Sequence, residues 1–310
     1  MKTRAHHFGE ERPLLLLSHP ADRLAQSFRA FAEKQGLSVW QPRRIDDFGW
    51  SFGIDGGERS LTFTRFDTGQ SFTSSELLGI FCHGQPPLDP ARTEDGADRR
   101  YAMIEYSNAL WPIWENASCP VVGQPPPTST PLLFNFGVEA RIEMRRLGLP
   151  AAPDTLVSFE RLAARADIDP ARTRLTRSGR YSSVLARHAL SGELPFSEPA
   201  MLGSEMVVAT PLGDSDPRMV LSFGGDAFTL APRDDGPPTV ENAPEPEVLA
   251  LVQRVRERLP TPLFLMSAVR GQAGWVITKL SLQLPFWMVD LVADWLHPRL
   301  YGHFTGEVLS

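Results

Sequence analysis

The first forty residues constrain the fold most, because an apolar strand, an amphipathic helix and a second strand follow one another with short connections. Residues 13–17 form an apolar run that predicts a buried strand. Residues 21–35 carry Leu24, Phe28 and Phe31 at helical spacing, and Gly36 ends the predicted helix before a strand resumes over 37–40. The chain therefore opens with a β-α-β unit.

The rest of the chain shifts from this alternation to short strands and turns. Strands are predicted over 61–66 and 77–82, and a helix around 101–111 precedes a proline-rich stretch at 125–131, the best candidate for a domain boundary. We therefore expect an α/β domain over 1–120 and an antiparallel-rich α+β domain over 121–310. In the second part the pattern predicts helices over 132–147 and 248–259, and strands over 206–210, 219–223, 263–269 and 275–280.

Composition excludes several functional classes. The 310 residues are 42% hydrophobic and 22% charged with a net charge of -6, which is typical of a globular protein and disfavours nucleic acid as a partner. Cys82 and Cys119 are too few for a secreted disulfide framework, so a cytoplasmic location is expected. The apolar runs at 14–17 and 284–296 are short or interrupted by charge, and no membrane partner is expected.

Lysine is nearly missing from the chain. Only Lys2, Lys34 and Lys279 are present, so no lysine lies between residues 34 and 279. An arginine-favouring genome accounts for much of this bias. Whatever its cause, a mechanism that needs a central lysine is excluded.

Residues 134–157 resemble the linker of ATP-grasp ligases. The helix that ends at Gly148, the following Leu149-Pro150 and the entry at 153–157 are similar to that family's "GL.(V/I)P.T" pattern. Phe136 stands where the family carries a lysine after Asn135. The resemblance is closest to glutathione-synthetase-like ligases and the maturases of microviridin-type peptides.

Three further segments occur in the order that this family shows. The strand over 79–83 ends in His83 before prolines, as in the N-terminal domain of the peptide maturases. Residues 218–228 are similar to the family's hairpin whose arginine contacts nucleotide phosphates, which implies a catalytic and nucleotide-binding role for Arg218. Residues 263–281 resemble the last hairpin, "D…dG-x-x-x-x-E-x-N".

The resemblance implies an ATP-grasp-like fold in which a β-α-β domain precedes an ATP-grasp-type domain with a lid subdomain over about 155–205. It also implies ATP and magnesium, which such ligases use to convert a carboxylate into an acyl phosphate. Ser267, Lys279 and Ser281 occupy the positions of the family's Asp, Glu and Asn ligands. Because no Asp or Glu occurs from Arg258 to Val289, we expect no magnesium bound in the usual way.

Arginines and one histidine complete the candidate site. Arg177 and Arg180 flank a Ser-Gly pair where the family has a phosphate-covering loop, and they would bind nucleotide phosphates, although a plain solvated turn explains the same residues. His83 is a candidate for substrate binding. The alternatives for His83 are a nucleophile-base pair with Cys82 and a purely structural side chain.

Two functions therefore remain open. The first is a diverged ATP-dependent carboxylate-amine or peptide ligase that tailors peptide or amino-acid natural products, with a small molecule or peptide as substrate. The second is a catalytically inactive pseudo-ligase that keeps the fold and binds a peptide, a metabolite or a partner enzyme.

Overall fold

The computed structural model describes residues 12–44, 47–55, 58–83, 116–123, 144–152, 155–158, 173–177, 206–211, 218–231, 239–241, 245–259, 261–271, 274–281 and 284–307. The chain divides into two compact units, 1–124 with 283–310, and 125–282. The last helix thus groups with the first unit, whereas the sequence division at residue 120 assigns it to the second domain. No helix within the described ranges is long and apolar enough to cross a membrane.

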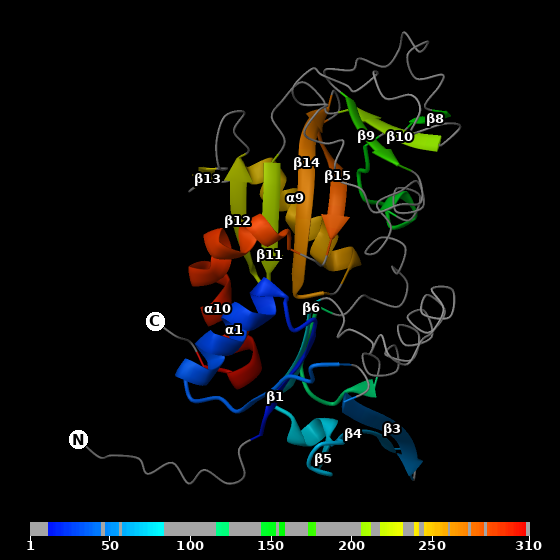
Figure 1. The fold of residues 1–310 in the computed structure, drawn as a ribbon. Helices are drawn as coiled ribbons and strands as arrows, with labels where there is room; N and C mark the ends of the chain where they lie inside the picture. The colour runs from blue at the N-terminus through cyan, green and yellow to red at the C-terminus, as the bar shows by residue number, and fades with distance from the viewer. Residues whose placement is uncertain are drawn as a thin grey trace, which may run out of the picture. The chain divides into compact units, whose positions relative to one another are not determined.

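The first unit is built on a parallel sheet of order β2-β1-β6-β7 (Figure 1). Its central strand β1 is buried at every position, which explains the continuous apolar run in the sequence. The predicted β-α-β opening is confirmed. Its elements are β1 (Leu14–Ser18), α1 (Arg23–Lys34), β2 (Val39–Trp40), β6 (Gly79–His83) and β7 (Val121–Val122).

An antiparallel meander covers one face of this sheet. Its strands are β3 (Phe48–Asp55), β4 (Glu58–Arg65) and β5 (Ser71–Thr73), followed by a 3-10 turn over Ser74–Glu76. Phe48, Phe63 and Trp40 form one buried cluster with Leu15 and Ile80 of the parallel sheet. The sequence predicted only the second of these strands, at 61–66, and missed β3.

Two helices pack together on the other side of the first unit, α1 and the C-terminal α10 (Val289–Thr305), which follows a 3-10 turn over Phe286–Met288 (Figure 1). Phe28 of α1 contacts Phe81 of β6 edge to face at 5.4 Å and lies 6.3 Å from Phe304 of α10. Phe304 also fills the space above Gly79, where a Cβ would lie 2.2 Å from its ring. The apolar run at 284–296 thus covers the 3-10 turn and the first part of α10, which continues to Thr305.

His297 of α10 is buried between aromatic rings. Its ring centroid lies 5.9 Å from Phe28 and 5.5 Å from Phe31, and its Nε2 lies 3.1 Å from Ser27 Oγ. Because the Ser27 hydroxyl donates to Leu24 O, the histidine donates its Nε2–H to Ser27 Oγ. Burial lowers the pKa of His297 from 6.5 to about 4, with Asp294 opposing the shift.

This burial predicts an acid-sensitive fold. Between pH 6.5 and about 4, His297 is protonated in the unfolded chain but not in the folded chain. The free energy of unfolding therefore falls as pH falls through this window. The loss is about 2 kcal/mol after allowance for residual solvent. Urea unfolding from pH 7.5 to 4.5 should show that His297→Gln loses this part of the pH dependence. Partial burial also lowers the pKa of His303 in the same helix, so His303→Gln should remove only a smaller part of the pH dependence and keep most of it.

The second unit contains two antiparallel sheets. The larger has the order β13-β12-β11-β14-β15, and α9 packs on one of its faces through Val248, Leu251 and Val252. The smaller has the order β8-β10-β9. Their elements are β8 (Thr155–Ser158), β9 (Thr173–Arg177), β10 (Met206–Pro211), β11 (Arg218–Phe223), β12 (Asp226–Ala231), β13 (Thr239–Glu241), α9 (Pro246–Arg258), β14 (Leu263–Gly271) and β15 (Gly274–Ser281).

The predicted strands at 206–210, 219–223, 263–269 and 275–280 and the helix at 248–259 are confirmed. The helices expected at 101–111 and over most of 132–147 lie outside the described residues.

Candidate functional site

Ser267, Lys279 and Ser281 lie together on one face of the larger sheet. Ser267 of β14 is directly opposite Lys279 of β15, and Leu265 is opposite Ser281. Because side chains alternate along a strand, Lys279 and Ser281 point to the same face, and Ser267 joins them. A bulge between Ser267 and Ala268 ends this register. The structure thus brings the three predicted positions into one patch, the Lys279 patch.

The Lys279 patch sits in an apolar, buried layer. The side chains of Ser267 and Ser281 are buried, at 5% and 2% exposed, and Lys279 is half-buried. The neighbouring strand β11 contributes Met219 opposite Ser267 and Leu221 opposite Leu265. Thr278, the extra residue at the bulge, donates from Oγ1 to Ser267 O at 3.2 Å. None of β11, β14 and β15 carries an acidic residue.

Arg218 lies on the opposite face of the same sheet. It is opposite Ala268, and it shares strand parity with Val220 and Ser222. Val220 packs in the cluster formed with α9, and Ser222 Oγ accepts a hydrogen bond from Arg256 Nε of α9 at 3.0 Å. The alternation therefore places Arg218 on the side that α9 covers. The structure does not bring Arg218 together with the Lys279 patch.

Of the other two predicted arginines, one lies in the smaller sheet. Arg177 is the last residue of β9 and is opposite Val207 of β10. Arg180 lies outside the described residues. Phosphate binding by either residue remains a prediction.

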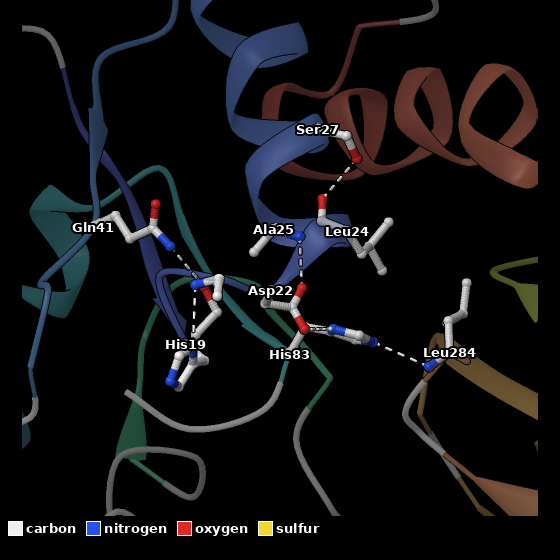
Figure 2. A network of polar contacts seen from close by, with 10 residues as sticks. His19, Asp22, Leu24, Ala25, Ser27, Gln41, His83 and Leu284 are labelled. Carbon is white, nitrogen blue, oxygen red and sulfur yellow. Dashed lines mark hydrogen bonds and ion pairs between the residues drawn. The ribbon is translucent and has the colours of Figure 1, made fainter. Parts of the chain in front are cut away.

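His83 ends strand β6 in the first unit and takes part in a polar network (Figure 2). Its Nδ1 lies 2.8 Å from Asp22 Oδ2, and the backbone N–H of Leu284 donates to its Nε2 at 3.0 Å. The other oxygen of Asp22 caps α1 by accepting from Ala25 N at 2.8 Å. Nearby, Gln41 donates to Ser18 Oγ at the end of β1.

These contacts define the protonation of His83. Because Nε2 accepts the Leu284 N–H, the proton of the neutral ring is on Nδ1, which donates it to Asp22. Both ring nitrogens are occupied and the side chain is 5% exposed. In this arrangement neither ring nitrogen of His83 is open to a substrate or a metal ion. The side chain links β6, the start of α1 and the segment before α10.

The cysteines add no nucleophile to this region. Cys82 and Cys119 are both buried, and they form no disulfide. Burial raises the pKa of Cys119 to about 11, so its thiol is protonated at neutral pH. Cys82 precedes His83 on β6, but His83 donates its only proton to Asp22 and its Nε2 holds Leu284.

No protein-family model matches the chain, and no curated protein matches it significantly. Solved structures do match it over nearly its whole length. One is the macrocyclase MdnC of Microcystis aeruginosa MRC bound with precursor peptide MdnA, with TM-score 0.66, 9% identity and coverage of 95% of this chain and 100% of that chain. The chain has the ATP-grasp fold.

Two further ATP-grasp ligases support this assignment. PsnB, complexed with a phosphomimetic variant of a minimal precursor, Mg and ADP, has TM-score 0.65 and 15% identity, covering 95% of this chain and 98% of that chain. A RiPP-associated ligase of Chryseobacterium gregarium, in complex with ADP and a leader and core peptide, has TM-score 0.60 and 12% identity, covering 94% and 95%. All three structures share the fold of this chain over nearly its whole length.

The ATP-grasp fold implies ATP and magnesium, and the Lys279 patch does not fit magnesium. Magnesium takes hard oxygen ligands, chiefly carboxylates and phosphates, in a near-ideal octahedron. The patch offers two neutral hydroxyls beside an ammonium, which repels a divalent ion. No group of three or more His, Cys, Asp or Glu side chains among the described residues is arranged to hold a metal.

Sequence reasoning did not identify the two hydrogen-bond partners of His83. Asp22 lies 61 residues from His83, and Leu284 lies 201 residues away. Asp22 is the N-cap of α1, one residue inside the helix predicted over 21–35, and an Asp near a helix start is a local signal for such a cap.

Proposed function

We propose that this protein works in peptide tailoring as an ATP-grasp pseudo-ligase that binds a peptide without magnesium-assisted chemistry. The Lys279 patch carries this proposal. An ATP-grasp ligase needs a divalent cation to neutralise charge on the transferring phosphate. Here an ammonium lies opposite Ser267 in a layer whose three central strands lack any acid.

The choice of a peptide rests on the structural neighbours. MdnC, PsnB and the Chryseobacterium gregarium ligase were each solved with a precursor or leader and core peptide. A chain that keeps this fold over 94–95% of its length retains the framework on which such peptides are recognised. Metabolites and a partner enzyme are the other ligands that a pseudo-ligase of this kind would bind.

The proposal predicts that the affinity for a peptide does not depend on ATP or magnesium. A displayed library of random peptides should yield sequences enriched on the full chain, and their affinities should change by less than about threefold, under 1 kcal/mol, when ATP and magnesium are added. No enrichment over the bare support would contradict peptide recognition. ATP-dependent covalent change of a selected peptide would contradict the pseudo-ligase.

A diverged ligase is the second candidate. It is favoured by two arginines at strand ends of the second unit, Arg177 at the end of β9 and Arg218 at the start of β11. Arginine binds phosphate bidentately and would replace part of the missing lysine and metal charge. ATP turnover with a carboxylate substrate, abolished by Arg218→Ala, would establish this candidate. The position of Arg218 on the α9 side of the sheet is the observation that weighs against it.

A further inference from the structure

A groove opens in the first unit beside the carboxyl ends of β1 and β2. Its larger part is a cavity of about 560 Å³, and a cavity of about 250 Å³ that reaches Pro20, just after β1, adjoins it. Both cavities are lined by Arg29 of α1 and by Gln41, Pro42 and Arg43, which directly follow β2. The larger cavity has the size of a ligand site, and open parallel sheets bind ligands outside the carboxyl ends of their strands.

Three arginines from separate elements line the larger cavity, and we call the two cavities together the arginine groove. The arginines are Arg29 of α1, Arg43 after β2 and Arg65 at the end of β4. The guanidinium of Arg65 lies over the Trp40 ring, 5.6 Å from its centroid, and the exposed Phe66 lines the same cavity. The wall of the groove therefore combines planar hydrogen-bond donors with apolar surface.

Two of these arginines form ion pairs and still keep donors for a ligand. Arg65 donates to Asp67 from Nε at 3.2 Å and from Nη2 at 2.9 Å, and Arg29 donates from Nε to Glu33 at 2.8 Å. Neither Arg65 Nη1 nor the terminal nitrogens of Arg29 bond to a residue that the structure describes. Because exposed ion pairs of this kind contribute little to stability, a ligand carboxylate can share these arginines at little cost.

Arg43 supplies the excess charge of the groove. Its exposed guanidinium forms no ion pair with any residue that the structure describes. Asp47, which also lines the groove, accepts from Arg44 at both oxygens, from the backbone N–H at 2.9 Å and from Nε at 3.3 Å. Among the described side chains, four arginines, the three of the groove and Arg44, therefore stand against three carboxylates and leave one positive charge, the carboxylates being those of Glu33, Asp47 and Asp67. The side chain of Asp46 lies outside the described residues.

We propose that the arginine groove binds an acidic segment of a peptide, with a carboxylate held by Arg43 and a neighbouring apolar side chain against Phe66. Arginine binds a carboxylate through paired N–H groups, and the groove holds more such donors than its own carboxylates use. Because the two cavities adjoin, they suit successive side chains of one peptide. This inference rests on the proposed peptide-binding function and adds where the peptide lies and which charge it carries.

The same groove disfavours a basic peptide. Each described carboxylate of its lining already accepts from an arginine, so a ligand lysine would have to displace a guanidinium. The lysine would also lie near the positive charge of Arg43, which repels it. The preference for an acidic over a basic peptide is therefore the property to measure.

The test uses the full chain and two fluorescent synthetic peptides, one in which glutamate alternates with leucine and one in which lysine replaces each glutamate. Fluorescence anisotropy compares wild type with Arg43→Glu. Arg23→Glu is the matched control, because it makes the same change in net charge at a partly exposed position of α1 that lines neither cavity. Circular dichroism checks that both variants are folded.

Wild type should bind the acidic peptide at least about tenfold more tightly than the basic one. Arg43→Glu should weaken binding of the acidic peptide at least about tenfold, and Arg23→Glu should change it by less than about twofold.

Equal losses in the two variants would overturn the inference, because they would show an effect of net charge alone. Equal binding of both peptides by wild type, or no binding of either, would also overturn it, whereas peptides enriched from the displayed library would still support the proposed function. If the acidic peptide does not bind, and citrate raises the melting temperature of wild type but not of Arg43→Glu, the groove belongs to a small anion instead.

Discussion

Asp22→Ala is expected to lower the free energy of unfolding by about 3 kcal/mol. The change removes the helix cap on Ala25 N, worth about 1 kcal/mol. It also leaves the Nδ1–H of the buried His83 without an acceptor, which costs about 1–3 kcal/mol. Urea unfolding monitored by circular dichroism measures the sum.

Two variants give this prediction its controls. Asp22→Asn keeps one oxygen for two donors, so it should cost roughly half as much. Asp290→Ala removes an exposed ion pair with Arg23, and such surface pairs are worth about 1 kcal/mol or less. If Asp22→Ala and Asp290→Ala cost the same, the network of Asp22 and His83 does not stabilise the fold.

The network also clarifies what His83 does. The sequence offered substrate binding, a base for Cys82 or a structural role, and the contacts at both ring nitrogens favour the structural one. It anchors the segment that leads into α10, and α10 in turn packs on α1. A substrate role for His83 remains a prediction that needs one of these two hydrogen bonds to open.

Local patterns predicted the elements with continuous apolar runs or clear helical spacing. The run at Leu14–Leu17 and the spacing of Leu24 and Phe28 in α1 signal burial without any knowledge of partners. Strand β3 was missed because Gly49 and Gly53 alternate with its aromatic residues, and glycine in a strand normally weakens the prediction.

Features that depend on the pairing of distant strands were not predicted, for a different reason. Strand parity is visible in sequence, but the register between strands is not, so the sequence grouped Arg218 with Lys279 although the pairing places them on opposite faces. The absence of acids from Arg258 to Val289 needed no register at all. It is therefore the part of the candidate site that sequence reasoning establishes most directly.

Charge reversal in the Lys279 patch is expected to have the second large effect. Lys279→Glu changes the local charge by two units and supplies an oxygen ligand beside Ser267 and Ser281. Combined with Ser267→Asp and Ser281→Asn, it should create a magnesium response that wild type lacks, seen as a rise in melting temperature with magnesium. Because a carboxylate pair without a cation repels itself, the variant should be less stable than wild type when magnesium is chelated.

Isothermal titration of the wild-type chain with ATP, with and without magnesium, tests the absence of the usual metal site most directly. An ATP affinity that magnesium changes by less than about threefold, or no ATP binding at all, is the predicted result. An affinity that rises about tenfold or more with magnesium, and falls back with chelator, would contradict it and show that the chain holds the ion by residues other than the Lys279 patch.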